Sequence, residues 1–345
     1  MIYNQLQQAY KVSCNSVYGF CGVTGNRDPE YRRFPKCCLV KFDKDKKYQC
    51  YTGYLANCWI AQTLTKQGRM LIDETSRLVV EKWPESQIIY GDTDSCYVNP
   101  GLSPDARGLK QGFVLGGKMA RYITAHFPKP IELEFEKFMR PFLQIAKKRY
   151  LYFEWEPGSK PKLGAKGVES QRRDNSFWLR NVYNEVSNII LPILDIDGDQ
   201  SARIDKSNII DLVNKSVHLH LENLRTNSIY PEEYVILKQL SGSGYKTPQI
   251  HSILREKIKS RVSDGLMTCD VPMPGDRMNF VVVQGIKSSK FTQRGEEPLY
   301  QMIHGPPIDR VYYLEKLRDA LCRMADCTMD LKPLFDLTTR ALPSF

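Results

Sequence analysis

Two short apolar runs flank a polar segment, and this arrangement restricts the local fold more than any other feature of the chain. Residues 88–90 have the β-branched and aromatic composition of a strand, and residues 96–98 have a similar composition. The segment between them, residues 91–95, reads Gly-Asp-Thr-Asp-Ser. Two strands joined by so few polar residues form an antiparallel hairpin. The sequence therefore predicts a hairpin with Asp92 and Asp94 at its tip.

The two aspartates of this hairpin form a candidate metal-binding pair. Their carboxylates are two residues apart, and a strand end would hold them near the open edge of a sheet. Hard cations such as Mg²⁺ take oxygen ligands and keep room for substrate phosphates, and two such ions can act together on a phosphoryl group. The alternative is that Asp92 and Asp94 only stabilise the turn through their own side chains.

The positive charge of the chain is concentrated in one region. The formal net charge is +10 and the sequence pI is about 9.0, which suits a polyanionic partner, either nucleic acid or an acidic membrane surface. Between positions 140 and 173 there are nine basic and three acidic residues, interleaved with aromatic side chains. Such alternation on strands is typical of a groove that follows a phosphate backbone. The alternative is an ordinary solvated face.

Composition excludes several other classes of protein. The 345 residues are 42% hydrophobic, which is enough for two or three domains with cores. None of the ten cysteines forms a C-x-x-C pair, so reduced thiols are expected and a zinc site is not. No run of about 18 apolar residues is present, and the N-terminus is polar. We therefore expect a soluble, intracellular protein without a membrane span.

A polar clasp is predicted near the N-terminus. Residues 1–18 read as a helix, and Lys11, Asn15 and Tyr18 are spaced by four and three residues. This spacing puts an ammonium, an amide and a phenol on one helical face. These groups suit a phosphate, a hydrogen-bonding edge and a ring. The alternative is an ordinary amphipathic helix.

The rest of the chain divides into a mixed part and a helical part. Helical periodicity is found at 54–82, 110–126, 176–191, 205–227, 248–262 and 308–326. Strands are predicted at 131–136, 142–156 and 280–283, with a further hairpin at 41–51. The change in character near 170–175 indicates a domain boundary.

Three motifs resemble those of family B DNA polymerases. Residues 11–19, Lys-x-x-x-Asn-Ser-x-Tyr-Gly, resemble motif B of the fingers helix. Residues 90–95, Tyr-Gly-Asp-Thr-Asp-Ser, resemble motif C, and residues 147–150, Lys-Lys-Arg-Tyr, resemble the palm motif that grips the primer end. They occur in the order of the family.

Flanking segments are similar to the delta/zeta branch of this family and to related enzymes of large DNA viruses. These segments are residues 133–137 and 166–175, and in the thumb 275–277 and 307–314. The resemblance covers the chain from about residue 5 to about residue 330 and implies an α+β fold. It implies a fragment of the right-hand polymerase architecture, in which an antiparallel palm sheet with packed helices precedes a mainly helical thumb.

The resemblance also implies domain limits and roles. Residues 1–22 would be the C-terminal fingers helix, 23–174 the palm and 175–345 the thumb. Lys11 would contact the triphosphate of the incoming dNTP, and Asn15 and Tyr18 would lie against the nascent base pair.

In the palm, the resemblance implies a metal site and a primer-binding surface. Asp94 would be the metal-ligating carboxylate of motif C, Asp92 belongs to the same motif and is the second candidate catalytic and Mg²⁺-binding residue, and Glu136 would lie near an accessory metal position. Lys147 and Lys148 would touch the primer terminus and Tyr150 its backbone. The residues implied to bind primer–template DNA are Lys147, Lys148, Arg149, Tyr150, Lys166, Arg172 and Arg173.

The family's motif A, a strand carrying the other essential metal-binding aspartate, has no counterpart among the 345 residues. We therefore expect the C-terminal part of a DNA-directed DNA polymerase, which shares two Mg²⁺ ions with a motif A aspartate from another polypeptide segment or subunit. Alone it would be inactive or nearly so. The alternative is a catalytically silent fragment that retains the DNA groove. Either would work in the nucleus or host nucleus, with a cytoplasmic replication site as the alternative.

Overall fold

The chain forms two compact units. The computed structural model describes residues 2–22, 40–42, 48–50, 57–103, 106–191, 206–242, 244–285, 290–326, 331–333 and 335. Unit 1 comprises Met1–Leu102 with Gln111–Phe135, and unit 2 comprises Ser103–Lys110 with Glu136–Phe345. The division into fingers, palm and thumb stays a prediction.

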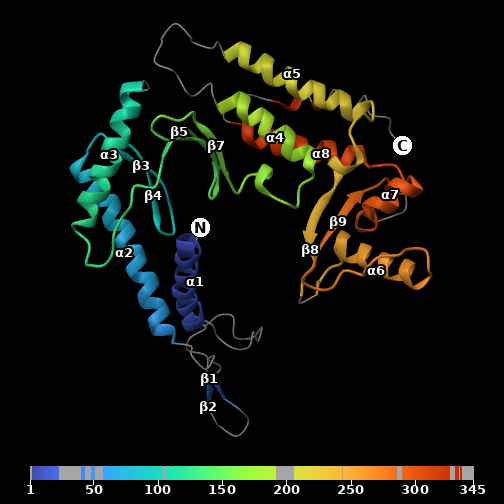
Figure 1. Ribbon diagram of the computed structural model, residues 1–345, viewed down its shortest axis with the longest axis horizontal. Coiled ribbons are helices and arrows are strands. Elements are labelled where there is room, and N and C mark those ends of the chain that lie inside the picture. Colours follow the sequence, from blue (N-terminus) through green and yellow to red (C-terminus); the bar gives the residue numbers. More distant parts are fainter. Residues whose placement is uncertain are drawn as a thin grey trace. The chain divides into compact units, whose positions relative to one another are not determined.

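Unit 1 consists of helices and two separate hairpins (Figure 1). Its elements are α1 (Ile2–Gly22), β1 (Val40–Phe42), β2 (Tyr48–Cys50), α2 (Cys58–Lys82), β3 (Gln87–Asp92), β4 (Ser95–Asn99) and most of α3 (Ala106–Thr124). β1 pairs with β2 and β3 with β4, both antiparallel. The hairpin predicted at 41–51 and the hairpin with two aspartates are therefore confirmed.

Helices α1 and α2 of unit 1 pack against each other, and α2 begins and ends at residues typical of helix termini. The side chain of Asn57 caps α2 by accepting from the Ile60 amide at 3.3 Å, as Asn does at helix N-termini. The helix ends at Trp83, directly before Pro84, which cannot continue it. The Asn57 amide donates to the Cys21 carbonyl at 3.1 Å and so joins α1 to the start of α2.

The described residues of unit 1 form a small buried core. Its four buried members in this part of the chain are Leu78 and Val79 from α2 and Met119 and Ile123 from α3. Partly buried side chains from the hairpin and the neighbouring loops pack against them, namely Trp83, Ile88, Val98, Leu115, Tyr122, Phe127 and Leu133. The hairpin is thus supported on one side by helices α2 and α3.

The strand predicted at 131–136 is wrong. This segment has no regular structure, although its residues alternate between apolar and acidic. The Leu133 amide donates to the Thr124 hydroxyl at 2.9 Å, and that hydroxyl lies 3.3 Å from the Leu133 carbonyl. A side chain at the end of α3 therefore satisfies backbone groups that a neighbouring strand would otherwise bind.

Unit 2 combines two antiparallel three-stranded sheets with a helical core (Figure 1). The first sheet has the order β5-β6-β7, and the second β10-β9-β8. The strands are β5 (Phe138–Ala146), β6 (Arg149–Trp155), β7 (Lys162–Lys166), β8 (Ile236–Gln239), β9 (Arg277–Val282) and β10 (Gly295–Glu296). The strand predicted at 142–156 is in fact two strands, because the chain turns at Lys147 and Lys148.

The helices of unit 2 confirm four predicted segments. They are α4 (Phe177–Ile190), α5 (Lys206–Arg225), α6 (Ile250–Ser263), α7 (Pro298–His304) and α8 (Arg310–Ala325), with 3₁₀ turns η3 (Glu169–Gln171), η5 (Pro231–Tyr234) and η6 (Phe291–Gln293). The periodicity of the sequence did not predict α7, which has seven residues and no buried side chain.

Helix α4 lies at the centre of the core of unit 2, where it packs against α5 and α8. Val182, Tyr183 and Val186 of α4 have no exposed surface. The Tyr313 hydroxyl of α8 donates to the Tyr234 carbonyl at 2.8 Å and accepts from the Val282 amide at 3.0 Å. One buried phenol therefore joins α8 to the second sheet.

The described part of the chain is α+β, as predicted. It holds eight α-helices, and all paired strands run antiparallel. This class of structure follows from short hairpin connections between strands and from long apolar helices that cover them.

Candidate functional site

The β3–β4 hairpin closes through a two-residue turn. Asp92 pairs with Ser95, so that only Thr93 and Asp94 lie between the strands. The Asp94 amide and the Ser95 hydroxyl both donate to the Asp92 carbonyl, at 2.6 and 3.0 Å. Thr93 has a φ of 57°, in the left-handed region that tight hairpin turns use. Two hydrogen bonds to the Asp92 carbonyl therefore hold the backbone of the tip in this turn.

The two carboxylates at this tip differ in exposure. Asp94 is exposed, whereas Asp92 is half-buried and accepts from the Thr93 hydroxyl at 3.2 Å. Behind them the rings of Tyr90 and Tyr97 lie 5.2 Å apart, directly opposite each other in the ladder. The aromatic pair stabilises the hairpin, and the Asp94 carboxylate remains accessible to a cation.

These carboxylates fit a divalent cation only in part. Mg²⁺ is bound by one or two protein carboxylates together with waters and substrate phosphates, and the tip offers two such groups. In the part of the chain that the structure describes, no group of three or more His, Cys, Asp or Glu side chains could hold a metal ion. Asp92 and Asp94 are thus an incomplete set for the two ions that the resemblance implies.

Helix α1 presents the predicted clasp to solvent. Lys11, Asn15 and Tyr18 are all exposed, and Tyr18 exposes 44% of its surface. Lys11 is the one charged residue in the sequence of α1.

Neither α1 nor any other helix of the described residues is long and apolar enough to cross a membrane.

The basic turn between β5 and β6 is held by a neighbouring glycine. Lys148 has a φ of 62°, and Tyr150 of β6 pairs with Lys166 of β7. Gly167 follows directly, with a φ of 66°, and a Cβ there would lie 2.1 Å from the Lys148 carbonyl oxygen. Only glycine combines this backbone angle with so close an approach. The turn is therefore packed against the end of β7.

Some of the predicted DNA-binding residues present unpaired charges at the surface. Lys147, Lys166 and Arg173 are exposed, and none of them forms an ion pair with another described residue. Lys148 is also exposed and belongs to the same turn as Lys147. The Arg173 carbonyl accepts from the Leu237 amide at 3.2 Å, so its backbone is fixed beside β8. Lys147, Lys166 and Arg173 can therefore bind phosphate without first leaving an ion-pair partner among the described residues.

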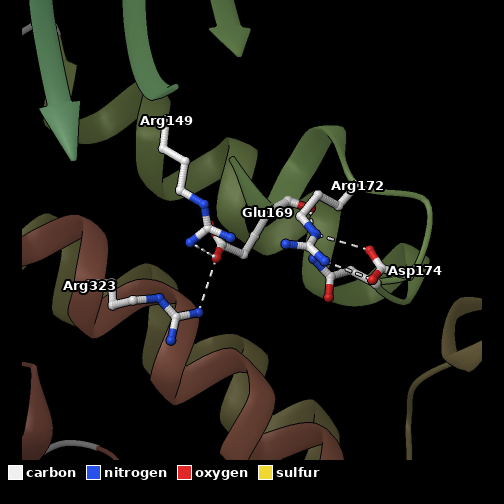
Figure 2. Close-up of polar contacts among 6 residues, drawn as sticks. Arg149, Glu169, Arg172, Asp174 and Arg323 are labelled. Carbon is white, nitrogen blue, oxygen red and sulfur yellow. Dashed lines mark hydrogen bonds and ion pairs between the residues drawn. The ribbon is translucent and has the colours of Figure 1, made fainter. Parts of the chain in front are cut away.

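Two of the predicted DNA-binding arginines form ion pairs with carboxylates (Figure 2). Arg149 Nη1 lies 3.3 Å from Glu169 Oε1, and Arg172 binds both oxygens of Asp174 at 3.0 and 2.8 Å. The bidentate hydrogen bonds from the Arg172 guanidinium lower the pKa of the Asp174 carboxyl below its ordinary value. Both guanidinium groups therefore take part in ion pairs within unit 2.

Two further predicted residues lie in contrasting surroundings. Tyr150 is 2% exposed, and its ring packs 5.2 Å from Phe142 and 6.0 Å from Tyr152. The Glu136 side chain is 78% exposed, and its nearest ion-pair partner is the Lys137 ammonium at 3.7 Å. Tyr150 therefore belongs to the packing of the first sheet, whereas the Glu136 carboxylate is open to solvent.

The structure adds two residues to which the sequence assigned no role. Glu169 is buried at 7% exposure, and it binds Arg323 of α8 at 3.0 Å as well as Arg149. The position of Glu169 within the motif at 166–175 could have indicated a role for it. No sequence pattern indicated a role for Arg323, because it is 154 residues from its partner.

The comparisons with known proteins agree on one family. Residues 1–30 and 49–328 match the profile described as DNA polymerase family B. The chain is 34% identical over 319 residues to the DNA polymerase delta catalytic subunit of Oryza sativa, covering 90% of this chain and 24% of that protein. It is 32% identical over 317 residues to the same subunit of Schizosaccharomyces pombe, with 90% and 25% covered.

A solved structure was also found, that of the family B DNA polymerase from the hyperthermophilic archaeon Pyrobaculum calidifontis. It has a TM-score of 0.49 and 21% identity over 80% of this chain and 30% of that chain. The chain spans about a quarter of the length of the polymerase delta subunits that it matches. Because the family profile covers nearly the whole sequence, the chain belongs to DNA polymerase family B.

Proposed function

We propose that this chain takes part in template-directed DNA synthesis, the transfer of a nucleotide from a dNTP to a primer 3′-OH, as the C-terminal part of a family B DNA polymerase. The observation that carries the proposal is the exposed Asp94 carboxylate on a tight, hydrogen-bonded turn in a chain of this family. Phosphoryl transfer depends on positioning and charge neutralisation more than on covalent chemistry by side chains.

The metal site would be shared. Asp92 and Asp94 would hold two Mg²⁺ ions together with a motif A aspartate from polypeptide outside these 345 residues, and Glu136 would serve an accessory position. Bound Mg²⁺ would neutralise charge on the phosphates and on the attacking oxygen. The incomplete donor set of the described residues supports this division of labour.

The nucleotide would be bound by α1, in the fingers segment 1–22. The exposed Lys11 ammonium would meet the triphosphate, and Asn15 and Tyr18 would lie against the new base pair. Because all three side chains lie on one exposed face of α1, one bound nucleotide could contact all of them.

The primer–template would lie on the basic turn of the palm segment, 23–174, and continue to the thumb, 175–345. Lys147, Lys148, Lys166 and Arg173 would contact phosphates or the degenerate minor-groove edge, as sequence-independent copying requires. Tyr150, Arg149 and Arg172 would act in the same surface. Their burial or ion pairing suits a supporting role beside the exposed cations.

A primer-extension assay tests this function. The purified chain is mixed with Mg²⁺, dNTPs and a labelled primer–template, alone and with a separately expressed segment of a relative that carries the motif A strand. We expect extension only in the mixture, because neither part holds the full carboxylate set.

Two outcomes would contradict the proposal. Robust extension by the chain alone would refute the need for a shared site. DNA binding without any extension in the mixture would favour the silent DNA-binding fragment. A filter-binding measurement on the same samples separates that outcome from a failure to bind DNA.

A further inference from the structure

One buried carboxylate joins two distant parts of unit 2. Glu169 Oε1 lies 3.3 Å from Arg149 Nη1 of β6 and 3.0 Å from Arg323 Nη2 of α8, so that a single oxygen receives both guanidinium groups (Figure 2). The Glu169 side chain is 9% exposed, whereas the Arg323 side chain is 52% exposed. The carboxylate is therefore internal, and its two partners reach it from different elements.

The backbone around Glu169 is also fixed. The Asn175 side-chain amide donates to the Glu169 carbonyl at 2.9 Å, and Arg180 Nε of α4 donates to the Ser170 carbonyl at 2.9 Å. Burying a carboxylate is unfavourable unless it is paired and hydrogen-bonded. These hydrogen bonds fix the backbone of Glu169 beside α4. The Glu169 carboxylate can therefore hold the side chains of its partners, Arg149 and Arg323, in place.

The partner on β6 lies directly after the basic turn. Arg149 follows Lys148, and Glu169 comes two residues after Gly167, the glycine that contacts the Lys148 carbonyl. The ion pair between Arg149 and Glu169 therefore links the two chain segments that flank this contact. Through Arg323 the same carboxylate connects the turn with α8.

We propose that Glu169 is a positioning residue for primer binding: it holds Arg149 against the helical core and so fixes the turn that presents Lys147 and Lys148. This inference rests on the proposed function for its purpose, but the anchoring itself does not depend on DNA. A fixed turn lowers the conformational entropy lost when its lysines bind a phosphate backbone.

The direction of the effect separates this role from simple electrostatics. Glu169→Gln removes a negative charge from a basic surface and releases two arginines, which by charge alone would tighten DNA binding. Positioning predicts the opposite result, because the turn becomes more mobile. We expect primer–template binding to weaken by about three- to tenfold in E169Q.

A matched control exists elsewhere in unit 2. Glu296 is 5% exposed and binds Arg261 through both oxygens, at 2.6 and 3.0 Å. Glu296→Gln makes the same charge change and breaks a comparable buried pair, but it has no contact with the basic turn. We expect its DNA affinity to stay within about twofold of the wild-type chain, allowing for the modest effect of an added charge.

The experiment combines DNA binding with hydrogen exchange on the full 345-residue chain. Affinity for a primer–template duplex is measured by fluorescence anisotropy, and amide exchange is followed in peptides that cover residues 146–150. We expect faster exchange in those peptides for E169Q but not for E296Q. Unchanged or tighter DNA binding by E169Q, or unchanged exchange at the turn, would overturn the proposal.

Further variants cover the case in which E169Q does not fold. Arg323→Met removes only the α8 partner, and Arg318→Met, on the same helix, makes the same charge change beside Asp319. We expect faster exchange at the turn in R323M but not in R318M, with Arg323→Lys intermediate. The absence of this difference would overturn the proposal. If the wild-type chain does not bind DNA, the proposed function fails, while the exchange data still decide whether the cluster fixes the turn.

Discussion

The two units differ in how much of their own apolar surface they bury. Among the described residues, the core cluster of unit 1 contains four buried residues, whereas that of unit 2 contains thirty-four, the size of core expected for a stable domain. In α1, Tyr10, Val12 and Val17 expose 60% or more of their surface, and Trp59 of α2 exposes 72%. By contrast, Val182 and Tyr183 of α4 expose none.

This difference teaches that two sets of proposed functional residues, one in each unit, are supported differently. The aspartate hairpin and the α1 clasp lie in the unit with little burial, whereas the basic turn lies in the unit with the large core. Segments with few buried apolar contacts open most easily. We therefore expect the carboxylate hairpin to depend on further binding for its order, and the basic turn to be ordered by unit 2 itself.

The largest effect is expected for the hairpin tip of unit 1. Asp94→Asn should lower primer extension by about a thousandfold in the complemented assay, because an amide cannot replace a metal-binding carboxylate. Asp73→Asn, an exposed aspartate of α2 in the same unit, is the matched control and should leave the rate unchanged. Near-normal extension by D94N would remove the hairpin from the active centre.

A large difference in stability between the units is expected next. Leu317→Ala deletes a side chain of α8 with no exposed surface and should lower the free energy of unfolding by about 2–5 kcal/mol. Leu64→Ala, at 49% exposure in α2, should change it by no more than about 0.5 kcal/mol. Urea denaturation followed by circular dichroism measures both. Similar losses would show that the α2 surface is more important to stability than its exposure indicates.

A smaller effect is expected for single cations of the basic surface. Lys147→Gln, Lys166→Gln and Arg173→Gln should each lower the slope of log affinity against log salt by about one, the release of one counterion. Lys259→Gln, an exposed lysine of α6 in the same unit, should leave the slope unchanged. Binding titrations at several salt concentrations give these slopes. Equal slopes for all four variants would show that the duplex does not bind at the basic turn.

The smallest effect concerns pH. His251 of unit 2 is 1% exposed and lies 2.7 Å from the Tyr245 hydroxyl, and burial, aided by the charge of Lys238, lowers its pKa below the ordinary 6.5. The unfolded chain therefore takes up the proton first, and the free energy of unfolding should fall as pH decreases below about 6.5.

The variant His251→Gln should flatten this slope in denaturation experiments between pH 7 and pH 5. The wild-type chain measured under the same conditions supplies the control. An unchanged slope in the His251 variant would mean that another group of the core controls the acid sensitivity.

The sequence predicted those features that depend on neighbouring residues. The hairpin tip followed from two apolar runs and a polar connection, and the helix expected at 176–191 is Phe177–Ile190, because its apolar period is regular. Residues 131–136 show where such patterns fail. Their alternation resembles a strand, but the Thr124 side chain binds the backbone at Leu133 instead.

The part of the site that could not be predicted depends on residues far apart in the chain. Arg149 was expected at the DNA because its motif carries that meaning in the family. Within the structure its side chain also pairs with Glu169, which is 20 residues away, and Arg323 is 154 residues beyond Glu169. No local pattern indicates which basic residue of the proposed DNA surface is paired with a carboxylate and which is exposed.

The left-handed backbone at Lys148, with its φ of 62°, has a consequence for engineering. A side chain in this conformation costs about 1 kcal/mol or more relative to glycine, so a chain selected for thermal resistance alone would carry glycine or asparagine at that place. A screen for more heat-stable variants of this protein would therefore favour Lys148→Gly or Lys148→Asn. Either substitution would remove a positive charge from the basic turn. If the proposed function holds, thermal stability and DNA binding would impose opposite requirements on this one position.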